Sequence, residues 1–165
     1  MSSGGAAAVG EDDFRAWMTR YPTGVAVVTT TDADGHPRGM SCSSLSSVTL
    51  DPPTVAVCLR TDAVTCVAVE ARGEFALNLL HSGGRHAAQT FSGPVADRFA
   101  AVEWQWSNGK LPWLRADTYA LAECQVAGTV IVGDHTIVLG TVTGLRAGDG
   151  DPLVYAHREY RKLQP

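Results

Sequence analysis

Two long apolar runs in the second half of the chain, residues 119–132 and 135–146, are separated only by Gly133 and Asp134. Both runs are rich in Val, Ile and Thr, and a Gly–Asp dipeptide between two such runs is typical of a tight hairpin turn. β-Branched runs of this length, without the strand–helix alternation of a parallel sheet, favour a closed or nearly closed antiparallel barrel. The pair therefore predicts a mainly β protein.

The first half of the chain supplies further strands of the same kind. Residues 25–31 and 54–59 are β-branched and apolar, and residues 75–80 form another apolar run. Asp34 and Gly35 form a tight-turn sequence after the first of these strands. We expect six or seven mostly antiparallel strands in all.

Three short helices are expected beside the strands. Residues 62–72 and 84–91 read as two of them. The third follows an acidic start and has apolar residues at helical spacing, which predicts a face that packs on the sheet: Phe14, Trp17, Met18 and Tyr21. We expect a disordered tail over residues 1–10 and one domain over residues 11–165.

Composition excludes several classes of function. The 165 residues carry a net charge of −4 without a basic stripe, so nucleic acid is not an expected partner. The N-terminus lacks the basic start and the apolar core of a signal peptide, and no apolar segment is long enough for a membrane span, which makes the cytoplasm the expected location. The four cysteines and five histidines show no metal-ligand spacing, and no metal site is expected.

Five serines fall among the seven residues 41–47, between strand-like segments. Small hydroxyls and free backbone N–H groups can line the phosphate and the polar ring edge of a flat ligand laid against a strand. The alternative interpretation is an edge strand with a solvated Ser/Thr face. Glycine-rich dinucleotide, P-loop and hydrolase motifs are absent from the sequence, so a ligand would be held without them.

Six segments occur in the order typical of one family: FRAWMTRYPTGVAVVTT, GMSCSSLSSVTLDPPTVAVCL, FALNLL, DRF, GDHTIVLG and PLVYAHREY. With them the chain resembles the short-chain flavin reductases from about residue 14 to residue 163. The resemblance implies the FMN-binding split barrel, a six- to seven-stranded antiparallel β-barrel with short helices. It also implies an NAD(P)H:flavin oxidoreductase that works as a homodimer and supplies reduced flavin to a partner monooxygenase.

The resemblance implies a set of cofactor-binding residues. Most of residues 40–48 would line the flavin, namely Met40, Ser41, Cys42, Ser43, Ser44, Ser46, Ser47 and Val48. Further flavin contacts would come from Cys58, Leu59, Arg60, Thr65 and Arg98. Relatives place Asn78 close to the flavin, although it could instead form hydrogen bonds within the sheet or at an interface. Phe99 could cover the flavin or the adenine, or pin a loop to the core. Arg60 or Arg98 could supply the positive charge that a flavin phosphate requires.

On the nicotinamide side, the resemblance points to His135, with His157 and Tyr160 in the tail as further candidates. A histidine beside Asp134 at a hairpin turn also has an ordinary interpretation as a turn residue. One position departs from the family pattern: Asp62 stands where many relatives have a small hydroxyl. A carboxylate would repel a phosphate there, although it could instead cap the helix that follows. The choice between FAD and FMN stays open.

The implied chemistry is hydride transfer from NADH, or NADPH, to FAD or FMN. It belongs to the two cofactors, so no strong acid or base is required of the protein. The alternatives are an FMN-dependent oxidase on the same barrel, a non-catalytic flavin-binding module, and a barrel for another apolar ligand. The oxidase would need a cluster of cations for a phosphorylated substrate, and the chain has only two lysines.

Overall fold

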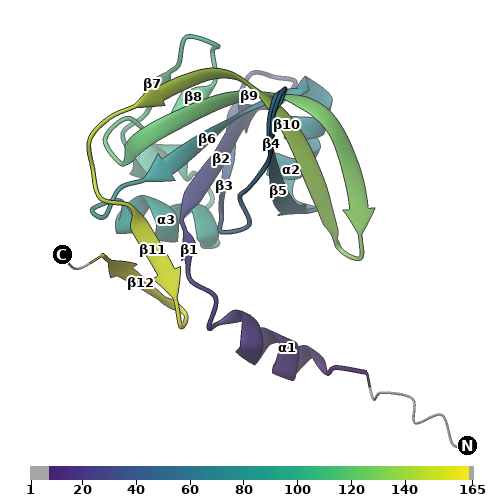
Figure 1. Ribbon diagram of the computed structural model, residues 1–165. Coiled ribbons are helices and arrows are strands. Elements are labelled where there is room, and N and C mark those ends of the chain that lie inside the picture. Colours follow the sequence, from purple (N-terminus) through teal and green to yellow (C-terminus); the bar gives the residue numbers. More distant parts are fainter. Residues whose placement is uncertain (1–7, 164–165) are drawn as a thin grey trace, which may run out of the picture.

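The computed structural model describes residues 8–163, and its main feature is a seven-stranded antiparallel sheet in the order β3-β2-β6-β9-β10-β5-β4 (Figure 1). The bounds of its strands are Ala26–Thr31 for β2, Pro37–Cys42 for β3, Ser46–Leu50 for β4, Pro53–Arg60 for β5, Glu74–Leu80 for β6, Thr118–Val132 for β9 and His135–Ala147 for β10. The predicted mainly β fold is confirmed. Most of the predicted disordered tail, residues 1–7 of 1–10, lies outside the described residues.

β9 and β10 form the predicted hairpin, and it is the longest pairing in the sheet. Gly133 has a φ of 59°, a conformation that glycine adopts without the steric cost paid by other residues. His135 is paired with Val132 across the turn, and the same strand continues the sheet to β5 on its other side. The two bulges in the hairpin curve it around the core.

Apolar side chains from several strands fill the core inside the curved sheet. Val28, Leu59, Leu77 and Val138 are almost fully buried in one cluster, together with Phe75. Phe75 lies so close to β10 that a Cβ on Gly140 would be 2.5 Å from its ring. This close approach explains the glycine in the middle of a long strand.

Residues 8–163 contain three α-helices: α1 (Glu11–Met18), α2 (Val64–Arg72) and α3 (Arg85–Ser92). α2 and α3 pack on the sheet through buried residues. The expectation that α1 also packs on the sheet is wrong, because none of its residues is buried and it lies apart from the barrel (Figure 1). The spacing of its apolar residues indicates an apolar face, but it does not identify the surface that would cover this face.

Smaller elements complete the described chain. β1 (Thr23–Gly24), β11 (Leu153–Ala156) and β12 (Glu159–Lys162) form a three-stranded sheet beside the barrel. The 3-10 helix η1 (Phe99–Ala101) and the strands β7 (Gln105–Trp106) and β8 (Pro112–Trp113) lie in the stretch between α3 and β9. None of the described helices has the length and apolar character needed to cross a lipid bilayer.

Candidate functional site

The serine-rich segment connects two strands that are not neighbours in the sheet. β3 ends at Cys42 and β4 begins at Ser46, so part of the segment forms the connection between the two edges. The Ser44 hydroxyl accepts a hydrogen bond from the Cys58 N–H at 2.9 Å and donates to the Cys58 carbonyl at 3.1 Å. Ser44 therefore ties this connection to β5 and brings the two edges of the open sheet together.

A cavity of about 680 Å³ opens on one side of this segment. We call it the arginine cavity because Arg38, Arg60 and Arg98 line it. It brings together six of the predicted flavin contacts: Met40, Ser41, Arg60, Thr65, Arg98 and Phe99. Ser41 donates its hydroxyl to the Ala88 carbonyl at 2.8 Å, so this serine also anchors α3 to β3.

The three arginines of this cavity differ in their partners. Arg38 forms an ion pair with Asp32 at 2.7 Å, and Arg60 forms a two-pronged pair with Asp62. Asp62 therefore neutralises Arg60, and the alternative that it caps α2 is wrong, because α2 begins without a side-chain cap. Among the described residues no carboxylate pairs with Arg98.

Backbone carbonyls hold Arg98 in place. Its Nη1 donates to the Gly39 carbonyl at 2.7 Å and its Nη2 to the Gly93 carbonyl at 3.0 Å. Its Nε is buried and has no hydrogen-bond partner among the described residues. A half-buried cation without a counter-ion is costly, so the site favours an anion in the cavity. A cavity with hydroxyls, an aromatic ring and one uncompensated guanidinium fits a flavin with its phosphate.

A second cavity, of about 470 Å³, lies on the other side of the segment and is lined by the predicted residues Ser43, Ser44 and Ser46. We call it the serine cavity. A third, of about 380 Å³, shares Ser43 and Ser44 with it and is also lined by residues of α1 and of the tip of the β11–β12 hairpin. We call this one the tail cavity. The serine segment thus divides the predicted flavin contacts between two sides.

Several predicted contacts line none of these three cavities. Cys42 and Leu59 are buried in the core, and burial raises the pKa of the Cys42 thiol to about 11. Ser47 and Val48 are exposed on β4. Cys58 lies on β5 and contributes its backbone to the Ser44 bridge.

Asn78 is fully buried on β6, and protein groups satisfy its side chain. Its amide donates to the Val27 carbonyl and to the Thr29 hydroxyl, at 3.2 and 3.0 Å. Its oxygen accepts from the Leu114 N–H at 2.9 Å. These bonds join the sheet to the segment that leads into β9, which is a structural role.

The nicotinamide candidates lie in two places. His135 is exposed, and its register partner on β5 is Arg60, which lines the arginine cavity. A hydrogen bond from its ring holds the pKa of the Asp134 carboxyl below its usual value. His157 and Tyr160 lie on the β11–β12 hairpin, and the Tyr160 ring packs against Tyr155 at 5.1 Å.

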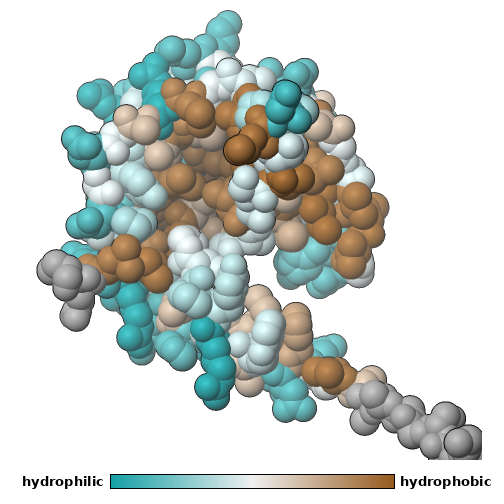
Figure 2. All heavy atoms as spheres, viewed as in Figure 1, coloured by the Kyte–Doolittle hydropathy of each residue, from teal (hydrophilic) through white to brown (hydrophobic). Residues whose placement is uncertain are grey.

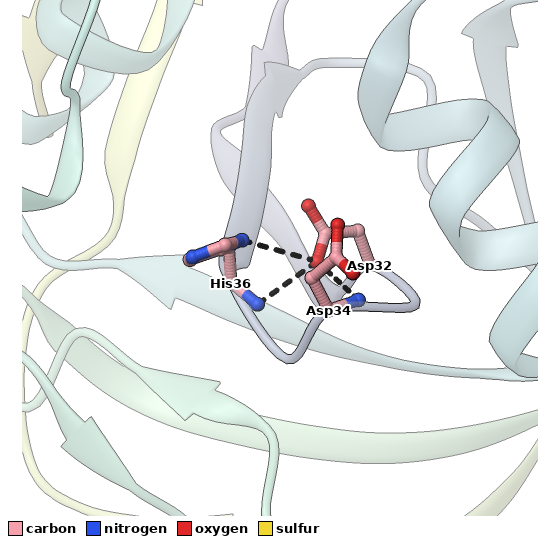
Figure 3. A group of neighbouring side chains, drawn as sticks. All are labelled: Asp32, Asp34 and His36. Carbon is pink, nitrogen blue, oxygen red and sulfur yellow. Dashed lines mark hydrogen bonds and ion pairs between the residues drawn. The ribbon is translucent and has the colours of Figure 1, made fainter.

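Asp32, Asp34 and His36 form a compact group in the turn between β2 and β3, shown in Figure 3. The Asp32 carboxylate accepts hydrogen bonds from the backbone N–H groups of Asp34 and His36 and from the Arg38 side chain. These bonds shape the turn and orient Arg38, so the group has a structural explanation.

Sequence reasoning missed Arg38, Gly39 and Arg158, all of which matter to the cavities. Gly39 is buried, and a Cβ there would be 2.8 Å from the Phe91 ring, so glycine is required where β3 meets α3. Arg38 and Arg158 have no local motif. Their place at a cavity depends on strand pairing over long distances in the sequence.

The chain is similar to known proteins over most of its length. The family model described as "Flavin reductase like domain" matches residues 18–164. The chain is 49% identical to a flavin reductase (NADPH) from Lentzea aerocolonigenes, over 93% of this chain and 90% of the relative. It is 44% identical to a flavin reductase (NADH) from Kitasatospora aureofaciens, over 92% of this chain and 81% of the relative.

A solved structure shows the same fold. The nitrilotriacetate monooxygenase component B homologue from Mycobacterium thermoresistibile superposes with a TM-score of 0.88 at 32% identity. The match covers 94% of this chain and 87% of that one. The predicted split barrel is thereby confirmed as the fold.

Proposed function

This chain belongs to the family of flavin reductase-like domains, and from this we infer that it is an NAD(P)H-dependent flavin reductase. Its relatives include one enzyme named for NADPH and one named for NADH. The reaction requires a flavin and a nicotinamide nucleotide in contact, and the protein has to hold both.

The flavin is proposed to bind along residues 40–46 with its phosphate in the arginine cavity. The observation that carries this proposal is Arg98, a half-buried cation whose Nε has no partner among the described residues. Thr65 lines the same cavity from α2, and its side chain can add a hydroxyl. The ring would then extend along the segment toward Ser43 and Ser44. FMN and FAD both carry the phosphate that Arg98 would bind.

When both are bound, the nicotinamide supplies a hydride from C4 and the flavin accepts it at N5. The protein has to orient the two rings, exclude water and offer hydrogen bonds to the polar ring edge. Ser43 and the backbone of the connection between β3 and β4 can provide such bonds, whereas the Ser44 hydroxyl is already engaged by Cys58.

The test is the loss of the absorbance band of NADH or NADPH when the purified protein is added, with FMN, FAD, riboflavin or no flavin present. Oxidation that depends on added flavin is the expected result. A protein that retains flavin but oxidises neither nicotinamide would favour the non-catalytic binding module instead.

His135, the register partner of Arg60, is proposed to orient the nicotinamide. We expect His135→Ala to raise the KM for the nicotinamide nucleotide by about three- to tenfold, the effect of losing one hydrogen bond, with little change in the KM for flavin. Steady-state kinetics check this. His36→Ala is the matched control, because His36 is also an exposed histidine beside an aspartate at a turn. Unchanged KM and kcat in His135→Ala would remove His135 from the site.

The partner is proposed to be a flavin-dependent monooxygenase that consumes the reduced flavin. The support is the similarity to a protein named as a component of nitrilotriacetate monooxygenase. Both kinds of transfer, by free diffusion and within a complex, are compatible with a cavity that opens to solvent.

A homodimer is proposed on the basis of exposed apolar side chains at one end of the sheet. Figure 2 shows them over the end of the β9–β10 hairpin, where Val130, Ile131 and Val132 are more than half exposed. Apolar surface of this kind is typical of an interface between copies of a chain.

Ile131→Asp is therefore expected to shift the protein toward the monomer in sedimentation equilibrium. Leu145→Asp is the control, since Leu145 is also exposed on the hairpin but lies near its opposite end. A wild-type protein that is monomeric, or equal shifts in both variants, would contradict this interface.

A further inference from the structure

The tip of the β11–β12 hairpin consists of two non-glycine residues in the left-handed conformation. His157 has a φ of 53° and Arg158 a φ of 63°. A two-residue hairpin turn of this type requires positive φ at both positions, and Asn–Gly is the sequence that adopts it at least cost. The chain instead places a long cationic side chain at the second position. Such local strain is a recurrent feature of binding sites.

The hairpin is held firmly enough to impose this conformation. Tyr155 and Tyr160 pack against each other across the strands and against the neighbouring core cluster. Arg85 of α3 lies over the Tyr160 ring at 5.9 Å. The His157 N–H donates to the Thr19 carbonyl at 2.8 Å, which fixes the turn against the end of α1. Arg158 is therefore presented from a rigid support.

Arg158 lines the tail cavity together with a second cation, Arg15 of α1. No aspartate or glutamate is found among the described residues that line this cavity. Arg15 has an ion pair with the exposed Asp12, whereas Arg158 has none within residues 8–163. The remaining lining combines hydroxyls with the rings of Tyr21 and Tyr155. This chemistry suits a molecule that carries phosphate groups as well as flat rings.

We propose that Arg158 binds a phosphate group of the nicotinamide dinucleotide. The tail cavity shares Ser43 and Ser44 with the serine cavity, so a molecule in it reaches the segment that is proposed to hold the flavin ring. The flavin phosphate has its own cation, Arg98, on the other side of that segment. Arg158 is therefore assigned to the phosphates of the second substrate, the nicotinamide dinucleotide.

This assignment rests on the proposed function, since a flavin reductase has to bring both nucleotides together. A nicotinamide dinucleotide offers two kinds of phosphate that Arg158 could bind. The pyrophosphate is common to both nucleotides, and the 2′-phosphate is present only in NADPH. Arg158 on the pyrophosphate would affect both equally, whereas Arg158 on the 2′-phosphate would affect NADPH alone.

The experiment uses Arg158→Gly and Arg158→Gln in the full chain. Dissociation constants for NAD⁺ and NADP⁺ are measured by calorimetry, so that the readout does not depend on turnover. Both variants are expected to bind one or both nucleotides about five- to tenfold more weakly, the effect of losing a charge-assisted hydrogen bond. Arg161→Gln is the matched control, because Arg161 is on the same hairpin, pairs with Glu159 and does not line the cavity.

Thermal unfolding separates binding from structure. Arg158→Gly relieves the left-handed strain and is expected to raise Tm by about 2–4 °C while binding becomes weaker. A structural role for Arg158 would make stability and binding fall together. Binding unchanged in both variants, binding that falls only with stability, an equal loss in Arg161→Gln, or a wild type that binds neither nucleotide would each overturn the assignment. The wild type could also bind the nucleotides without reducing flavin. If the Arg158 variants then bound the nucleotides more weakly, the result would support the site and reject the proposed function.

Discussion

Arg98→Gln is expected to raise the KM for FMN by about 10- to 100-fold, which corresponds to losing a charge-assisted contact of roughly 1.5–3 kcal/mol. The reason is that Arg98 is the one arginine of the arginine cavity without a carboxylate partner among residues 8–163. Riboflavin, which has no phosphate, should show a much smaller change in KM. Steady-state kinetics with both flavins check this, and the ratio of the two KM values isolates the contribution of the phosphate to binding.

Two further variants control this result. Arg60→Gln should have a much smaller effect than Arg98→Gln, because Asp62 already neutralises Arg60. Arg98→Lys should retain part of the preference for FMN over riboflavin. A lysine keeps the positive charge but cannot reproduce the pair of hydrogen bonds that the guanidinium donates to the Gly39 and Gly93 carbonyls. An Arg98→Gln protein that folds and keeps its preference for FMN over riboflavin would show that the phosphate binds elsewhere.

Asn78→Ala is expected to lower the free energy of unfolding by about 3–5 kcal/mol, because it leaves buried partners unsatisfied and opens a cavity in the sheet. The Leu114 N–H, the Val27 carbonyl and the Thr29 hydroxyl all lose a partner. Urea unfolding measures the change. In the fraction that remains folded, the KM for flavin should be unaltered, since Asn78 lines none of the three cavities described above.

Asn108→Ala provides the comparison for a solvent-exposed asparagine, and its stability should change by less than about 0.5 kcal/mol. A small loss of stability in Asn78→Ala, together with a large rise in the KM for flavin, would mean that Asn78 contacts the cofactor. The sequence alone supports both roles, and the hydrogen bonds favour the structural one.

Much of the sheet could be predicted from the sequence because its signals are local. Gly133 and Asp134 mark the hairpin turn, and the strands on either side agree with the expected ranges to within one residue at each end. The serine segment lies between strand-like runs in the sequence, and in the structure it contains the end of β3, a connection and the start of β4. Ser44 could not be recognised as the link to Cys58, since that bond depends on the closure of the sheet.

The candidate site was predictable in its residue types but not in its arrangement. Arg60 and Arg98 are equally plausible phosphate ligands in the sequence, and only the structure distinguishes them, through the ion pair between Arg60 and Asp62. The same limit applies to α1, whose apolar spacing is clear although no partner surface in residues 8–163 buries it. Both features depend on contacts between segments that are distant in the sequence, and no local sequence pattern predicts such contacts.

The most direct test of the site is a crystal structure of the protein with FMN bound. We expect the phosphate within hydrogen-bond distance of the Arg98 guanidinium, and the isoalloxazine ring along residues 40–46. A phosphate bound at Arg158 in the tail cavity, or a flavin that contacts neither cavity beside the serine segment, would contradict the assignment of the flavin to the arginine cavity.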